Sequence, residues 1–236
     1  MNNFSIVIPL YNEAQNIEQL VKEIFLSLEE YHDYEIIFVN DCSEDKTKNI
    51  LEILQKRHSK IKTINNTKNL GQSHSIFNGI RKAKYKLIVT LDGDCQNNPK
   101  DIPSIVKKYN EYEDIFLVGG IRSKRKDTFI KIYSSYLANL IRQIILKDGC
   151  PDTGCSLKAF DRDIFLNFPF FDGIHRFLPA LFLGFGKKTY FINVDHRPRL
   201  FGKSKYGTFL RLIRGIFDII KVMKIINDQK KKQNKI

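Results

Sequence analysis

Short apolar runs alternate with longer amphipathic stretches over the first half of the 236-residue chain, and this alternation restricts the fold more than any other feature. The runs with strand character are Ser5–Leu10, Glu35–Asn40, Ile61–Ile64, Lys86–Leu91 and Asp114–Val118. The stretches with helical spacing are Ala14–Tyr31, Asp45–His58, Gln72–Ala83 and Asp101–Tyr109. Such alternation is typical of βαβ units. We therefore predict an α/β fold with a mostly parallel, Rossmann-like sheet flanked by helices.

The alternation weakens after Gly120. The elements expected there are a helix over Asp127–Leu146, a loop over Gly149–Cys155, a strand over Ser156–Phe160, a helix over His175–Phe185, a strand over Thr189–His196 and a basic loop over Arg197–Gly207. We expect one domain over residues 1–206, divided into halves at 1–120 and 121–206. A helix over 207–227 and a disordered basic tail over 228–236 would follow, because lysine-rich polar segments bury too little apolar surface to fold alone.

The chain is strongly basic, with 39 Lys and Arg against 26 Asp and Glu and a net charge of +13. This balance favours anionic partners, which include nucleic acid, phosphorylated ligands and acidic membranes. No nucleic-acid-binding motif is present. The neighbouring carboxylates of Asp92 and Asp94 would also repel a polyanion in the absence of a metal, so we expect no nucleic-acid partner.

The four cysteines have no CxxC spacing, which argues against a zinc site. The N-terminus enters a strand pattern directly and has no signal-peptide pattern. No stretch of 18 uncharged apolar residues is present, so we expect no transmembrane helix. Together these features predict a cytosolic protein with reduced thiols.

Polar clusters follow three of the predicted strands. Tyr11-Asn12-Glu13 comes after the first, Asn40-Asp41-Cys42-Ser43 after the second and Asp92-Gly93-Asp94 after the fourth. Ligands of open α/β sheets bind beyond the carboxyl ends of the strands. The sequence therefore predicts a ligand site at this edge.

The run LIVTLDGDCQ at Leu87–Gln96 carries the strongest chemical signal. If strand geometry persists, Asp92, Asp94 and Gln96 share one face, because side chains alternate along a strand. Hard oxygen ligands of this kind suit Mg²⁺ or Mn²⁺, whose shells are usually completed by substrate phosphates. The alternative is a plain Asp-Gly-Asp turn that caps the following helix.

Four first-half motifs, VIPLYNE, FVNDCSEDKT, NLGQSHS and LDGDCQNNP, resemble those of family 2 glycosyltransferases with the GT-A fold. Three second-half motifs, GGIRSKRKD, DTGCSLKAF and HRPRLFGKSKYG, resemble the polyprenyl-phosphate branch of that family. The branch includes dolichol-phosphate mannosyltransferases and bacterial undecaprenyl-phosphate glycosyltransferases. The resemblance covers roughly residues 4 to 225. It implies that residues 1–120 bind a nucleotide-sugar and residues 121–206 the acceptor.

The resemblance also implies roles for individual residues. The nucleotide-sugar would contact Pro9, Tyr11, Glu13, Asn40, Asp41, Gly71, Asp92, Gly93, Asp94, Arg199 and Lys205. Asp92, Asp94, Arg199 and Lys205 would be catalytic, and Asp92, Asp94 and Gln96 would hold the metal. The acceptor phosphate would lie near Arg122, Lys131 and Ser135. Lys131 stands where many relatives carry Arg, which keeps the charge but loses the bidentate fork.

The implied reaction moves a sugar from a UDP- or GDP-linked donor to a polyprenyl phosphate. A single displacement would invert the anomeric configuration. The alternative is a family 2 enzyme that glycosylates a sugar hydroxyl, which requires a general base. Asp152 would be that base, although the sequence DTGC lacks the acidic pair expected of such enzymes.

The segment from Thr208 to Ile226 suggests membrane attachment. Arg211, Arg214, Asp218 and Lys221 recur on one helical face and apolar residues occupy the rest. We expect this helix to lie in the interface of an anionic membrane and to keep the protein peripheral on the cytoplasmic face. Alternatively, its apolar face packs on the protein's own core or on a small membrane subunit.

Overall fold

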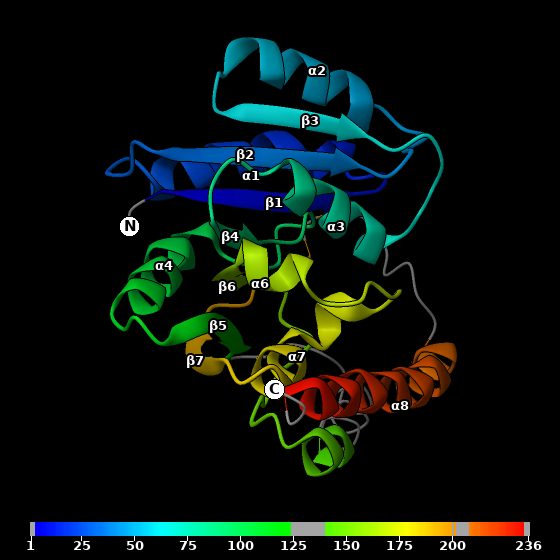
Figure 1. The fold of residues 1–236 in the computed structure, drawn as a ribbon. Coiled ribbons are helices and arrows are strands. Elements are labelled where there is room, and N and C mark those ends of the chain that lie inside the picture. The colour runs from blue at the N-terminus through cyan, green and yellow to red at the C-terminus, as the bar shows by residue number, and fades with distance from the viewer. Residues whose placement is uncertain (1–2, 124–139, 200, 202–207, 234–236) are drawn as a thin grey trace.

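The computed structural model describes residues 3–123, 140–199, 201 and 208–233. In this part of the chain, helices cover both faces of a seven-stranded sheet with the order β3-β2-β1-β4-β6-β5-β7 (Figure 1). The strands are β1 Phe4–Leu10, β2 Tyr34–Asn40, β3 Ile61–Asn65, β4 Leu87–Thr90, β5 Ile115–Arg122, β6 Lys158–Asp161 and β7 Lys188–Val194. The helices are α1 Ala14–Ser27, α2 Thr47–Arg57, α3 Gln72–Lys82, α4 Ile102–Asn110, α6 Arg162–Leu166, α7 Leu178–Gly184 and α8 Thr208–Gln233. Two 3-10 turns span Pro99–Asp101 and Ile174–Arg176.

The mostly parallel sheet predicted from the sequence is confirmed. β1 pairs in parallel with β2 and with β4, β2 with β3, and β5 with β7. β6 is the exception, because it runs antiparallel to both of its neighbours, β4 and β5. The second half of the chain thus places a strand between two strands of the first half.

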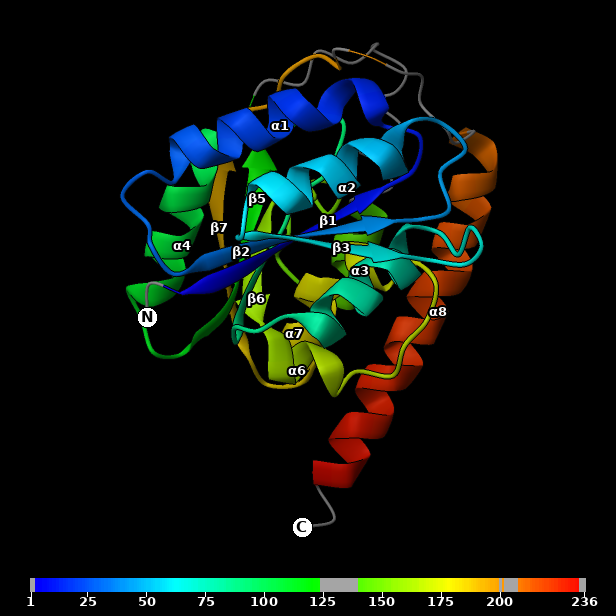
Figure 2. The same ribbon diagram turned by 90° about the horizontal axis from the view of Figure 1, so that it is seen from above.

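Side-chain alternation divides the core into two layers. On β1, Ile6 and Ile8 point into a layer with α1, α2 and α4, whereas Val7 points into a layer with α3, α6, α7 and α8. Figure 2 shows α1 and α2 on one side of the sheet and α8 on the other. Strands covered on both faces are apolar at nearly every position, which is why these runs were recognisable in the sequence.

The second half departs from the predicted elements at several places. Only residues 140–146 of the expected helix Asp127–Leu146 are described, and these are helical. The expected helix His175–Phe185 is divided instead, because Leu178-Pro179 begins a new helix, α7, after the short turn that ends at Arg176. Proline is favoured at such a start, where its missing N–H removes no helical hydrogen bond. The short helix α6 was not predicted, and the Asp161 side chain caps it by accepting from the Ile164 amide at 2.9 Å.

Helix α8 packs partly on the protein's own core. Val222 is fully buried, and Ile219, Ile225 and Ile226 pack against the same layer. A different set of apolar side chains remains exposed: Ile216, Phe217, Ile220 and Met223. The single apolar face expected for this helix is therefore divided, and Ile219 belongs to the core. Among the described residues, no helix has the length and apolarity needed to cross a bilayer.

The helix also continues beyond its predicted end. Residues 228–233 belong to α8, whereas the sequence predicted a disordered tail over residues 228–236. Lysine and glutamine are good helix formers. Lysines 230, 231 and 232 also lie in the last turn, where positive charge complements the helix dipole.

Candidate active site

Asp92 and Asp94 lie in a tight turn at the end of β4. The strand stops at Thr90, before the Leu91 end expected from the sequence, and the backbone of Cys95 has a positive φ of 59°. A Cβ on Gly93 would lie 2.1 Å from Leu10 Cδ2, so glycine is required by packing at this point. The two carboxylates are therefore brought together by a turn rather than by strand alternation.

The turn places two negative charges in a poorly solvated position. Burial, and then the charge of Asp94, raise the pKa of Asp92 to about 6, although a hydrogen bond with Ser156 and the charges of Lys158 and Arg122 oppose the shift. The amide of Gln72 also donates to Asp92 Oδ1 at 2.9 Å. A cation between the carboxylates would relieve this repulsion.

The basic segment after β7 reaches the same place. Arg199 Nη2 donates to Asp94 Oδ2 at 2.5 Å, and its Nη1 lies 3.7 Å from Glu13 Oε1. Asp94 also accepts from the Gln96 amide at 3.1 Å. Arg199 therefore joins the loop after β1 to the turn after β4, as expected for a residue at a shared site.

Asp41 organises the neighbouring loop. Its carboxylate accepts from Asn66 Nδ2 at 2.7 Å, from the Leu70 amide at 2.9 Å and from the Gly71 amide at 2.7 Å. Gly71 has a φ of 88°, a conformation that favours glycine, and begins α3. Asp41 thus fixes the approach to α3. At the start of α2, the Thr47 amide donates to Asp45 Oδ1 at 2.9 Å.

The other predicted nucleotide contacts lie at the same edge. Asn40 ends β2, donates to Asn65 Oδ1 at 2.8 Å and accepts from the Ser43 amide at 3.1 Å. Pro9 and Tyr11 lie at the end of β1 and are partly buried. The structure therefore brings together all the described residues that the sequence assigned to the nucleotide-sugar. Lys205 lies outside the described residues.

The predicted metal ligands, Asp92, Asp94 and Gln96, supply two carboxylates and one side-chain amide. Among the described residues, no cluster of three or more His, Cys, Asp and Glu side chains is arranged to hold a metal. Gln96 follows the two carboxylates, and its Nε2 donates to the Arg197 carbonyl at 3.4 Å. Two carboxylates and an amide oxygen fit Mg²⁺ or Mn²⁺, which bind few protein ligands and share substrate phosphates.

Arg122 and Asp152 form a bidentate ion pair. Arg122 Nε and Nη2 each donate to a different oxygen of Asp152 at 2.7 Å. A guanidinium in this geometry binds both carboxylate oxygens and fixes the orientation of the carboxylate. The pair joins the residue predicted to bind the acceptor phosphate to the residue considered as a general base. Lys131 and Ser135, the other predicted acceptor contacts, lie outside the described residues.

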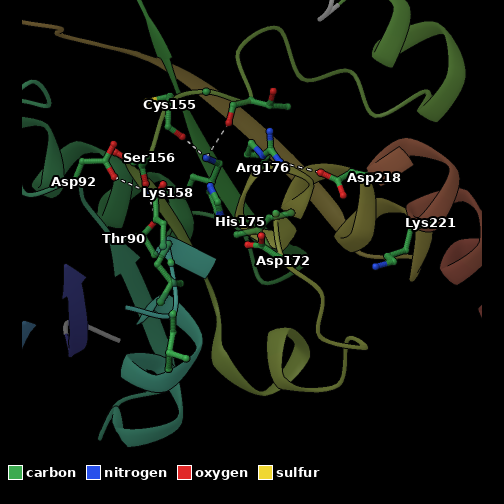
Figure 3. A pocket seen from close by; sticks show the side chains of 18 of the residues that line it. Thr90, Asp92, Cys155, Ser156, Lys158, Asp172, His175, Arg176, Asp218 and Lys221 are labelled. Atoms are coloured by element: carbon green, nitrogen blue, oxygen red, sulfur yellow. Dashed lines mark hydrogen bonds and ion pairs between the residues drawn. The ribbon is translucent and has the colours of Figure 1, made fainter. Parts of the chain in front are cut away.

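A pocket of about 680 Å³ extends from Asp92 to helix α8 (Figure 3). Its lining includes three groups to which the sequence assigned no role: Ser156, Lys158 and His175. His175 Nδ1 lies 2.8 Å from the Ser73 hydroxyl, which also accepts from the Gly173 amide at 2.7 Å. Lys158 lies in β6, and its charge within an otherwise apolar run was the only sign in the sequence that it could belong to a site.

The architecture is that of the GT-A fold, with the carboxylate turn directly after β4, beyond the carboxyl end of this strand. The sequence profile described as Glycosyl transferase family 2 matches residues 5–167. The chain belongs to this family, as the motifs predicted.

Two similar proteins act on polyprenyl phosphates according to their names. An undecaprenyl-phosphate 4-deoxy-4-formamido-L-arabinose transferase of Enterobacter sp. (strain 638) is 35% identical over 93% of this chain and 67% of its own length. A dodecaprenyl-phosphate galacturonate synthase of Rhizobium johnstonii is 34% identical over 93% of this chain and 66% of its own length. The chain thus spans about two thirds of the length of these relatives.

Solved structures share the fold at low sequence identity. Glucosyl-3-phosphoglycerate synthase of Mycobacterium tuberculosis, solved with Mn²⁺, UDP and glucosyl-3-phosphoglycerate, aligns over 94% of this chain and 78% of its own with a TM-score of 0.68 and 17% identity. Mannosyl-3-phosphoglycerate synthase of Rubrobacter xylanophilus aligns over 98% and 75% with a TM-score of 0.71 and 14% identity. These likenesses establish the GT-A fold.

Proposed function

We propose that the protein is an inverting, metal-dependent glycosyltransferase that moves a sugar from a UDP- or GDP-linked donor to a polyprenyl phosphate. The observation that carries the proposal is the carboxylate turn of Asp92 and Asp94, which opens into a pocket that reaches the exposed apolar residues of α8. The names of the two relatives support the same acceptor class.

The residues at the turn fit the donor end of this reaction. Asp92, Asp94 and Gln96 would hold Mg²⁺ or Mn²⁺, which would supply positive charge for the departing nucleoside diphosphate. Arg199 lies beside Asp94 and would add a second positive charge at the same place. Tyr11 and Glu13 would contact the nucleoside, with Asp41 holding the neighbouring loop in place.

The acceptor would need positioning more than activation. A phosphate monoester has a second pKa of about 6, so it is largely dianionic at neutral pH and can attack without a general base. Asp152 accepts two hydrogen bonds of 2.7 Å from Arg122, one at each carboxylate oxygen, and this engagement would hinder it from acting as a base. This pairing favours a phosphate acceptor over a sugar hydroxyl.

Membrane contact would bring the site to its lipid substrate. Ile216, Phe217, Ile220 and Met223 are exposed on α8, and the lysines of its last turn carry positive charge. Apolar side chains flanked by cations suit the surface of an anionic leaflet. We place the protein peripherally on the cytoplasmic face of a membrane, where nucleotide-sugars would be available.

The experiment that tests the proposal is a transfer assay with defined acceptors. Purified protein, Mn²⁺ and a panel of UDP- and GDP-sugars would be incubated with a short-chain polyprenyl phosphate, and the lipid product identified by mass spectrometry and its anomer by NMR. The matched polyprenol, without phosphate, is the control. We expect an inverted glycosyl phospholipid from the phosphate and no product from the alcohol. Transfer only to hydroxyl acceptors would contradict the proposal.

A further inference from the structure

The pocket joins two features that lie far apart in the sequence. Asp92 lies at one end and Lys221 of α8 at the other, with Lys158, His175 and Arg176 between them (Figure 3). Phe217 of the same helix also lines the pocket. Phe217 is 68% exposed, so one wall of the pocket continues into the exposed apolar stripe of α8. A ligand in this pocket can therefore reach the catalytic turn while part of it stays against the apolar surface of the helix.

Lys158 brings a buried positive charge close to the catalytic turn. The β4–β6 register pairs it with Thr90, two residues before Asp92. Lys158 is only 3% exposed, and its ammonium group donates to the carbonyls of Thr153 and Cys155. These hydrogen-bond partners are neutral, and the nearby carboxylate on which its charge acts is that of Asp92. The wall beside Asp92 thus offers a fixed cation to an incoming anion.

The opposite end carries a second available cation. Arg176 is neutralised by Asp218, whose Oδ2 lies 2.8 Å from Arg176 Nη2. Lys221 is exposed, with its ammonium 5.5 Å from the centre of the Phe171 ring, and it forms no ion pair within the described part of the chain. An anionic group that enters the pocket would first meet Lys221 at the opening and then Lys158 at the inner end.

The apolar lining specifies the rest of the ligand. Phe217 at the opening neighbours Ile220, three residues further along the helix, and Ile220 in turn neighbours Ile216 and Met223. Ile216, Ile220 and Met223 are 56%, 60% and 40% exposed. Leu178 and Ile76 contribute apolar wall inside the pocket. A ligand with an anionic head and a long apolar tail matches this arrangement, with cations inside the pocket and apolar side chains at its opening. A fully polar ligand would make no contact with the apolar end.

We propose that the pocket is the passage for the acceptor: its phosphate passes Phe217 and Lys221 and comes to rest at Lys158, while its hydrocarbon tail stays along the exposed stripe of α8. The inference rests on the proposed function and adds a binding wall on β6 and α8 to the predicted contacts at Arg122, Lys131 and Ser135. Lys158 is assigned to the attacking phosphate, and Lys221 and Phe217 to its guidance.

The test is steady-state kinetics with a short-chain polyprenyl phosphate in detergent micelles, which removes the requirement for membrane attachment. Lys158→Met should raise the acceptor KM at least tenfold, and Lys221→Gln and Phe217→Ser should each raise it several-fold. The donor KM and the affinity for the free nucleotide should stay within twofold of the wild type. Lys224→Gln is the matched control, since this exposed lysine is on the same helix but does not line the pocket.

The outcomes separate this inference from the function on which it rests. No transfer to polyprenyl phosphate by the wild type would refute the proposed function itself. Wild-type transfer combined with a raised donor KM and an unchanged acceptor KM in the variants would assign the pocket to the donor sugar and overturn the passage alone. If Lys158→Met does not fold, judged by its thermal transition, the exposed positions Lys221 and Phe217 decide the question.

Discussion

Arg199 forms an ion pair with Asp94, with 2.5 Å between its Nη2 and the carboxylate Oδ2. Arg199 therefore occupies the carboxylate that, in the proposed function, would also bind the metal. If Asp94 binds the metal as proposed, it would exchange the guanidinium for the metal, and Arg199 would then be available to the diphosphate. The basic segment after β7 and the turn after β4 are thus coupled through one carboxylate.

Asp94→Asn should lower transfer by about a thousandfold or more, because it removes a ligand charge where the leaving group gains charge. Asp94 is only 7% exposed and pairs with Arg199, so circular dichroism and the thermal transition are to be measured for the variant and rates compared well below its denaturation temperature. Mn²⁺ binding, measured by the loss of the free-ion electron paramagnetic resonance signal, should weaken in parallel. Full transfer by the wild type in excess EDTA would exclude a metal role.

Arg199→Ala should have opposite effects on metal binding and on catalysis. Without its guanidinium partner, Asp94 is available to the metal, and Mn²⁺ affinity in the absence of donor should rise by about tenfold, or 1.4 kcal/mol. Transfer should fall at least tenfold, because the charge that assists the leaving group is lost. Arg197→Ala, which removes an arginine bound to Glu23 instead, is the control. Weaker Mn²⁺ binding in Arg199→Ala would show that the ion pair does not compete with the metal.

Asp152→Asn distinguishes a phosphate acceptor from a hydroxyl acceptor. The transfer rate should stay within about tenfold of the wild type if the acceptor is already ionised. Stability should nevertheless fall by about 3 kcal/mol or more, since Arg122 loses the charge of its partner in a poorly solvated place. Rates are therefore to be measured well below the denaturation temperature of the variant. A loss of activity as complete as that of Asp94→Asn would support the general-base role.

The exposed stripe of α8 can be tested for membrane binding without removing the helix. Truncation after Gly207 would also remove the buried Val222 and a wall of the pocket, so surface substitutions are more informative. The triple variant Ile216→Ser, Ile220→Ser, Met223→Ser should sediment with anionic liposomes about tenfold less than the wild type, because less apolar surface can be buried. Leu26→Ser with Ile53→Ser, on the opposite face of the sheet, is the control. Equal sedimentation of both variants would assign attachment to another surface.

Gly184 and Ile226 fix the position of α8 on α7. A Cβ on Gly184 would lie 2.5, 2.8 and 2.9 Å from the Cγ1, Cδ1 and Cγ2 atoms of Ile226. Gly184→Ala should therefore destabilise the protein by about 1–3 kcal/mol. Ile226→Ala removes all three of these atoms, so the double variant should recover about 1–2 kcal/mol relative to the sum of the single effects. Urea denaturation of the four proteins measures the coupling, and strictly additive effects would contradict this contact.

The elements that the sequence predicted well are those whose signal is local. β1 and β2 are buried on both faces, and their apolar residues alone mark them as strands. The carboxylate pair was predicted for the same reason, because it directly follows such a strand. Its geometry was not, since the turn depends on Gly93 fitting against Leu10, a contact between distant parts of the chain.

The features that sequence reasoning missed depend on distant partners. Ile219 and Ile220 are adjacent and chemically identical, and only the docking of α8 on α7 decides which of them is buried. The only local sign of Lys158 is its charge within a short apolar run, which does not by itself mark a site residue. Its significance comes from the pairing of β6 with β4, which brings it near Asp92.

The position of β6 limits which segments can be exchanged between this chain and its relatives. β6 lies between β4 and β5, so neither half of the chain forms a continuous sheet without the other. A fragment that ends at residue 123 would leave edges of β4 and β5 unpaired, and such edges favour aggregation. An exchange of the second half with a relative would replace β6, an inner strand of the sheet, together with the acceptor contacts. New acceptor specificity is therefore more accessible through substitutions in the pocket and on α8 than through exchange of whole segments.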